Sequence, residues 1–143
     1  MALELNLKIL ILVIASIAAW IFGIAASNFS QEPLPSFFSD DSSVTLVALI
    51  VFTFSFLFFG YPSPLIMFLG GLMAGNHLKA LGIDPYILVL TSASILASYS
   101  SIQLGIALLD DMVGKGNFKQ ALKFSVITTA VFLIISVIFD LTR

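Results

Sequence analysis

Long apolar stretches, separated by short polar segments, constrain this chain more than any other feature of its sequence. A helix that crosses the roughly 30 Å hydrocarbon core of a bilayer needs about 20 apolar residues, because each residue advances it by about 1.5 Å. Of the five stretches, the first, fourth and fifth have that length. The second and third are shorter, and we expect them to span as well rather than to form a re-entrant hairpin. The predicted helices cover residues 7–26, 44–60, 64–80, 85–109 and 118–141.

The balance of apolar and charged residues places these helices in a membrane. Of the 143 residues, 59% are hydrophobic and 10% are charged, whereas a soluble domain carries roughly 25% charged residues. So few polar side chains cannot cover the surface of a soluble fold. We therefore predict an all-α fold, a polytopic transmembrane bundle of five helices in a single domain over residues 1–143. The first stretch exceeds the roughly 7–15 apolar residues of a signal peptide, so we expect a retained helix.

The distribution of lysine and arginine predicts the orientation of the bundle, because basic residues favour the cytoplasmic side. With the N-terminus in the cytoplasm, four of the six basic residues lie inside and two outside, namely Lys8, Lys115, Lys119 and Lys123 against Lys79 and Arg143. We therefore expect a multi-pass protein of the cell membrane with a cytoplasmic N-terminus and an outside C-terminus. Lys119 and Lys123 stand at a helix start, where the helix dipole disfavours cations. Contact with lipid headgroups is the expected compensation.

Proline marks the starts of two helices. The segment Gly60-Tyr61-Pro62-Ser63-Pro64 interrupts the apolar pattern and predicts a tight turn that joins two helices in a hairpin. Ser63 is the predicted N-cap of the following helix, with Pro64 at its first position. Asp84 and Pro85 repeat that pattern before the fourth helix.

Small residues at helical spacing predict where the helices pack. Lipid supplies no hydrophobic drive between helices, so association depends on close backbone approach and interhelical hydrogen bonds. The first helix has a small residue at every fourth position, the third has a GxxxG pair, and the fourth has a hydroxyl-rich seam that ends in glycine. These candidate packing residues are Ala15, Ala19, Gly23, Gly71, Gly75, Thr91, Ser94, Ser98, Ser101 and Gly105.

The fourth helix also carries a second polar set, Ser92, Tyr99 and Gln103. Because a helix that is polar on two sides is poorly suited to lipid, we predict that the fourth helix is central, whereas the phenylalanine-rich second helix faces lipid on much of its surface. The seam hydroxyls, with Gln103, also allow another interpretation, a polar path through the membrane. Intramembrane transport normally involves a charged residue near mid-helix, and residues 85–109 contain none.

Catalysis finds no support in the sequence. There is one histidine and no cysteine, and no phosphate-binding, metal-ligand or nucleophile motif. We expect no enzyme activity, no cofactor and no metal. His77, Asp110, Asp111 and Asp140 are candidate contacts to a partner or an ion, although His77 is more simply structural and Asp140 more simply paired with Arg143 at i+3. A net charge of −2 gives no reason to expect nucleic acid. The expected partners are the lipid bilayer, other membrane proteins and further copies of this chain.

The order of elements resembles that of the stage II sporulation protein M family (SpoIIM-like proteins), in which a first helix and an outward loop precede four closely spaced helices. Three stretches carry the resemblance: Gly60 followed by Leu69-Gly70-Gly71-Leu72-Met73-Ala74-Gly75; Asp84-Pro85-Tyr86-Ile87 through Ala93 and Ala97 to Gln103-Leu104-Gly105; and Phe118-Lys119-Gln120-Ala121-Leu122 leading to Ile138-Phe139-Asp140. The chain departs from the family where the fourth helix begins. Pro85-Tyr86 and Leu88-Val89-Leu90 stand where the family often has His-Gly and a glutamate, so no acidic site carries over.

The resemblance implies a non-enzymatic membrane scaffold or assembly component that acts together with other proteins. Two alternatives remain open at this point. One is a small oligomeric permease or channel with its path along the fourth helix. The other is an accessory subunit of a larger membrane complex.

Overall fold

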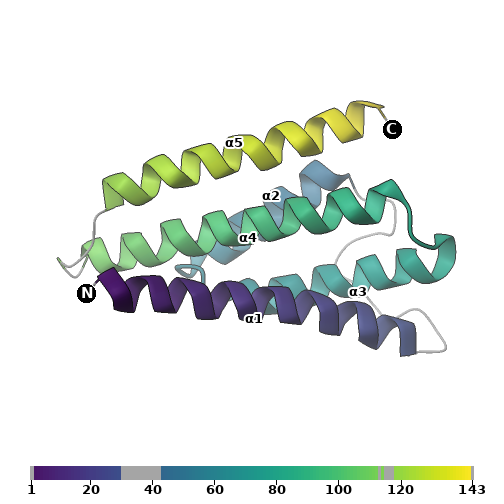
Figure 1. Ribbon diagram of the computed structural model, residues 1–143, viewed down its shortest axis with the longest axis horizontal. Helices are drawn as coiled ribbons and strands as arrows, with labels where there is room; N and C mark the ends of the chain where they lie inside the picture. The colour runs from purple at the N-terminus through teal and green to yellow at the C-terminus, as the bar shows by residue number, and fades with distance from the viewer. Residues whose placement is uncertain (1, 30–42, 113, 115–117, 143) are drawn as a thin grey trace.

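The computed structural model describes residues 2–29, 43–112, 114 and 118–142. Five helices occur in that part of the chain, which confirms the predicted all-α helix bundle (Figure 1). They are α1 (Ala2–Phe29), α2 (Val44–Leu57), α3 (Ser63–Leu81), α4 (Pro85–Met112) and α5 (Phe118–Thr142). At about 1.5 Å per residue, the 28 residues of α1 and of α4 make each helix roughly 42 Å long.

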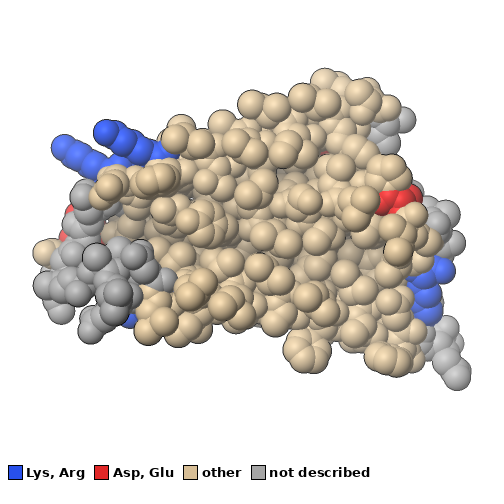
Figure 2. Space-filling view, in the orientation of Figure 1, with Lys and Arg blue, Asp and Glu red and all other residues tan. Residues whose placement is uncertain are grey.

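In the described part of the chain, three of these helices are long and apolar enough to cross a membrane, over Leu7–Phe29, Pro85–Met112 and Lys119–Thr142. α2 is apolar but has only 14 residues. Figure 2 shows the charged side chains at the two ends of the molecule, with an uncharged face between them. Along that face α1 and α5 expose large apolar side chains, for example Phe22 at 68% and Ile134 at 58%. This distribution is typical of a membrane protein.

The helices form three layers, with α1 and α3 below, α2 and α4 in the middle and α5 above in the view of Figure 1. We name the two ends of the bundle for later use. The Asp84 end is where α3 finishes and α4 begins, and the Lys119 end is where α4 finishes and α5 begins. The start of α1 lies at the Lys119 end and the finish of α5 lies at the Asp84 end.

The turn between α2 and α3 packs directly against α4. Phe59 and Gly60 take left-handed backbone conformations, with φ of 61° and 86°. A Cβ at Gly105 would lie 2.5 Å from the carbonyl carbon of Phe59, so only glycine lets the turn approach α4 this closely. The last seven residues of α4 extend beyond Gly105, by about 10 Å.

The predicted cap of α3 is wrong by one residue. Pro62 occupies the N-cap position and makes no side-chain capping bond, and Ser63 is the first residue of the helix. The Ser63 side chain is fully buried and is hydrogen-bonded to other helices instead. Asp84 does cap α4, because its Oδ1 accepts a hydrogen bond of 3.1 Å from the backbone N–H of Ile87.

α2 divides into a buried face and an exposed face. Val44, Val47, Ala48, Val51 and Ser55 are buried in the bundle. The opposite face exposes Leu46, Leu49, Phe54 and Leu57, and Phe58, just past the end of the helix, is exposed as well. The phenylalanines are thus only partly on the lipid-facing side that the sequence predicts, since Phe52 packs against Phe132 of α5.

Candidate functional site

The central helix α4 carries most of the candidate residues, and its position in the bundle matches the prediction. Of the residues in its most apolar stretch, 56% are buried, compared with 17% for the corresponding stretches of α1 and α5. It contacts every other helix that the structure describes. The hydroxyl seam, which we define as Thr91, Ser94, Ser98, Ser101 and Gly105, faces the interior, and four of these five residues are buried.

Ser98 belongs to a chain of three serine hydroxyls that joins three helices. Its Oγ lies 2.5 Å from Oγ of Ser63 at the start of α3. Ser63 Oγ in turn lies 2.9 Å from Oγ of Ser16 on α1, which is also 2.7 Å from the carbonyl oxygen of Leu12. All three serines are at most 2% exposed. Sequence analysis missed Ser16 and misassigned Ser63, although a lone serine within an apolar helix is itself a signal that a partner is needed.

The remaining hydroxyls of the seam differ in their hydrogen bonding. The Nε1–H of Trp20 on α1 donates to Oγ1 of Thr91 at 3.2 Å, and Ser101 donates to the carbonyl oxygen of Ser98 at 3.0 Å. Ser94 Oγ is buried without a hydrogen-bond partner among the described residues, as are Ser55 Oγ and Gln103 Oε1. The hydroxyls of the seam are therefore engaged with neighbouring groups, except for Ser94 Oγ.

The second polar set of α4 is divided between interior and surface, because Gln103 is half-buried with its Oε1 inside the bundle. Ser92 and Tyr99 are exposed, and Ser92 donates to the carbonyl oxygen of Leu88 within its own helix. Such a bond satisfies a hydroxyl on a lipid-facing surface without help from another helix. The central position of α4 is therefore accounted for by the seam and by Ser100. Ser100, which lies between Tyr99 and Ser101 in the sequence, was not predicted. Ser100 Oγ lies 2.7 Å from Ser125 Oγ and 3.0 Å from Thr129 Oγ1, both on α5.

α1 and α3 pack in parallel through the predicted glycines. A Cβ on Gly71 would overlap the carbonyl oxygen of Trp20, and one on Gly23 would overlap the carbonyl oxygen of Phe68. A Cβ on Gly75 would lie 2.6 Å from the Cβ of Ser27. The helix backbones therefore touch, as in small-xxx-small pairs of membrane helices. Of the other small residues predicted to pack on α1, Ala19 is partly buried and packs against the core, and Ala15 is half-buried.

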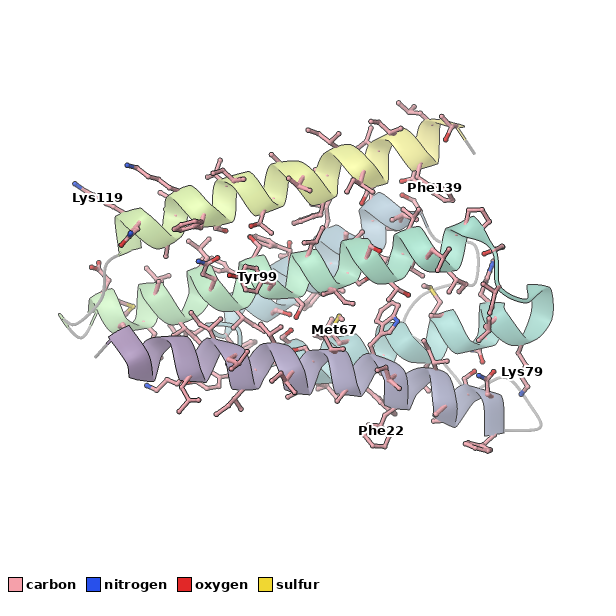
Figure 3. The ribbon with its side chains drawn as sticks, in the orientation of Figure 1. Phe22, Met67, Lys79, Tyr99, Lys119 and Phe139 are labelled. Atoms are coloured by element: carbon pink, nitrogen blue, oxygen red, sulfur yellow. The ribbon has the colours of Figure 1, made fainter. Side chains whose placement is uncertain are left out.

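Figure 3 shows how side chains fill the space between these layers. Met67 lies between α1 and α4 and is fully buried, whereas Phe22 points away from the bundle. Phe139 of α5 points toward the middle layer, where its ring lies 6.3 Å from that of Tyr86. The interior is thus a packed mixture of apolar side chains and bonded hydroxyls.

The Asp84 end of the bundle holds a buried histidine, His77. His77 is 4% exposed, and its Nε2 lies 2.9 Å from Oδ2 of Asp84, to which it donates when the carboxylate is ionised. Its ring lies 4.6 Å from that of Tyr86. The hydrogen bond from His77 holds the pKa of Asp84 below its ordinary value of 3.8, with help from the N–H of Ile87, while desolvation acts in the opposite direction. This pair ties the end of α3 to the start of α4.

Asp140 serves as a cap for another helix, a role that sequence analysis did not identify. Its carboxylate accepts from the backbone N–H groups of Val44 and Thr45, at 3.1 and 3.0 Å, and from the hydroxyls of Ser43 and Thr45, at 2.8 and 2.6 Å. The negative charge thereby meets the positive end of the α2 dipole. The predicted partner Arg143 lies outside the described residues.

At the opposite end, Asp110 is half-buried and Asp111 is exposed. The backbone N–H of Gly114 donates to the carbonyl oxygen of Asp111 at 3.0 Å, which closes a turn. Within the described ranges no group of three or more histidine, cysteine or acidic residues is arranged to hold a metal ion.

No protein-family model, curated protein or solved structure matches this chain.

Proposed function

We propose that this chain is a multi-pass protein of the cell membrane that acts as a non-enzymatic scaffold or assembly component, as its resemblance to the stage II sporulation protein M family implies. The observation that carries this proposal is the use of the polar groups inside the bundle. Ser16, Ser63 and Ser98 bond to one another between α1, α3 and α4, and Ser100 bonds to α5. Hydroxyls that hold helices together are not free to bind a substrate.

The outer surface supplies the rest of the support. α1 and α5 are the least buried of the three membrane-length helices, and they lie on opposite sides of the bundle (Figure 1). Their exposed apolar side chains, such as Phe22 and Ile134, are available to other membrane proteins or to further copies of this chain. A scaffold of this design would hold partners on two sides at once.

Photo-crosslinking in native membranes tests this proposal. A photoreactive amino acid at Phe22 or Ile134 should give discrete adducts with the same membrane proteins, or with a second copy, in repeated preparations. The matched control places it at Met67, which is fully buried and should give none. Adducts with lipid alone from both exposed positions would contradict a scaffold.

A small permease is the second candidate, and one observation favours it. Ser55 Oγ, Ser94 Oγ and Gln103 Oε1 are buried without a partner in the described part of the chain, and an unpaired buried polar atom costs free energy unless something binds it. In proteoliposomes a permease should conduct a small polar solute, and Ser94→Ala with Gln103→Leu should abolish the flux without unfolding the protein. Flux that depends on these residues would overturn the scaffold proposal.

A further inference from the structure

We propose that α2, α4 and α5 form a binding site for one anionic phospholipid, with an acyl chain in the groove between these helices and the phosphate at Lys119 and Lys123. This inference concerns a ligand and does not depend on the scaffold function. It rests on three features: the groove, the apolar character of its walls, and the two lysines about one helical turn away.

The groove has a volume of about 340 Å³, at the low end of the roughly 300–1,000 Å³ of ligand pockets. Its apolar walls are Phe52 of α2, Leu104 of α4, and Leu122, Val126, Ala130 and Leu133 of α5. Leu122 and Val126 are 40% and 58% exposed, so the groove opens at the surface of the bundle.

The walls select a hydrocarbon occupant. The two hydroxyls that line the groove, Ser125 and Thr129, already bond to Ser100 of α4. A polar ligand would therefore lose its hydrogen bonds to water and gain few in return. Because α5 is a membrane-length apolar helix, the groove opens toward acyl chains, which fill it at no such cost.

The lysines select the headgroup. Lys119 and Lys123 precede Leu122 and Val126 by three residues each, and side chains at i and i+3 share a helix face. Both lysines are exposed, and neither has a carboxylate partner within the described residues. Figure 2 shows basic side chains projecting from the bundle at the start of α5, where Figure 3 labels Lys119. A phosphate there would meet both ammonium groups and the positive end of the helix dipole.

Asp110 and Asp111 at the same end do not occupy this position. They lie six and seven residues past Leu104 along α4, so they are farther from the bilayer centre than the groove wall. The two lysines are nearer to the groove along their own helix, three residues before Leu122 and Val126.

Native mass spectrometry of the full chain tests the site. The protein is purified in detergent that contains equal amounts of phosphatidylglycerol and phosphatidylcholine with identical acyl chains. We expect one phosphatidylglycerol to remain bound in preference, and Lys119→Gln or Lys123→Gln to lower its retention roughly fivefold each. Lys8→Gln is the matched control, because it removes a lysine from the Lys119 end on α1, away from the groove. Equal retention of the two lipids, or equal losses in all three variants, would overturn the proposal.

A second variant tests the groove independently of charge. Ala130→Phe places a ring in the groove from an exposed backbone position on α5 and should lower the retention of both lipids. Circular dichroism of each variant checks that the helices remain folded.

Added glycerol phosphate, which has the headgroup without chains, should not displace the lipid at equal concentration. Displacement by it, or retention unchanged in Ala130→Phe, would show that the chain is not held in the groove.

Discussion

Ser63 lies where three helices meet, and its hydroxyl is bonded to one serine on each of the other two. The sequence predicted a local role for this residue, because serine before proline is a common start of a helix. The structure instead uses Pro62 as the cap, and Ser63 bonds to residues 47 and 35 positions away. Local sequence patterns do not report partners at such distances, so this part of the site could not be predicted.

Replacing Ser63 by alanine should destabilise the bundle without changing its fold. Interhelical hydrogen bonds in membrane proteins average about 0.6 kcal/mol, so the loss of two should cost roughly 1 kcal/mol. Reversible unfolding in mixed detergent micelles measures this change. Ser92→Ala is the control, since Ser92 bonds only within its own helix, and its free energy of unfolding should stay within about 0.5 kcal/mol of the natural value. An equal loss in both variants would contradict a specific role for the serine chain.

The glycines of α1 and α3 were predicted from their spacing, because close approach of two backbones demands missing side chains and leaves a pattern in the sequence. Gly71→Leu should separate the two helices, since even a Cβ at this position overlaps the carbonyl oxygen of Trp20. Overpacking of this kind costs about 1–3 kcal/mol. Thermal unfolding of the variant should show that loss, whereas Ser92→Leu on the exposed face of α4 should not. A natural unfolding temperature for Gly71→Leu would mean that the helices are not in backbone contact.

The His77–Asp84 pair gives the Asp84 end a dependence on acid. Because the pKa of Asp84 is lowered in the folded state, the folded protein binds its proton less tightly than the unfolded chain does. The contribution of the pair is therefore complete above pH 3.8 and is lost as the pH falls through the lowered folded value. Amide exchange at Ile87, whose N–H bonds to Asp84, should accelerate below pH 3.8 relative to the intrinsic rate. Asp84→Asn should remove that acceleration, and Asp111→Asn should leave it in place.

At the scale of elements, the sequence predicted the five helices well, because each is a long apolar stretch bounded by proline, glycine or charge. α1 is the largest exception, since it begins at Ala2 and ends at Phe29 rather than over 7–26. A helix continues as long as its backbone N–H and C=O groups are hydrogen-bonded, so polar residues beside an apolar stretch do not end it. What the sequence did not reveal is that one helix caps another, because Asp140 and Thr45 are 95 residues apart.

Asp140→Ala should loosen the start of α2 while leaving α4 intact. Hydrogen bonds to a charged group contribute about 1.5–3 kcal/mol, and Asp140 accepts bonds from three residues at the α2 start. We expect a loss of about 2 kcal/mol in unfolding free energy and faster amide exchange at Val44 and Thr45. Asp111→Ala, an exposed aspartate at the other end, is the control. Unchanged exchange at Val44 in Asp140→Ala would contradict the capping role.

At the scale of the whole molecule, lysine placement predicts a cytoplasmic N-terminus, an orientation that labelling can test. The chain has no cysteine, so single cysteines can report that orientation directly. In intact cells a membrane-impermeant maleimide should modify Ile83→Cys from outside and Lys8→Cys only after permeabilisation. Tyr61→Cys should behave like Lys8→Cys if α2 and α3 span as predicted. The reverse pattern at Ile83 and Lys8 would place the N-terminus outside.

Because α1 packs in parallel against α3, it can complete its packing only after α3 has been synthesised. Ser27 of α1 bonds to Asn76 of α3, 49 residues later in the chain. At roughly 5–20 residues per second of synthesis, α1 must wait about 2.5 to 10 s for its partner. During that interval the face of α1 that carries Gly23 has no helix to pack against. A ribosome that pauses between α1 and α3 would prolong this exposure, so the newly made chain is most vulnerable to quality-control proteases before its third helix emerges.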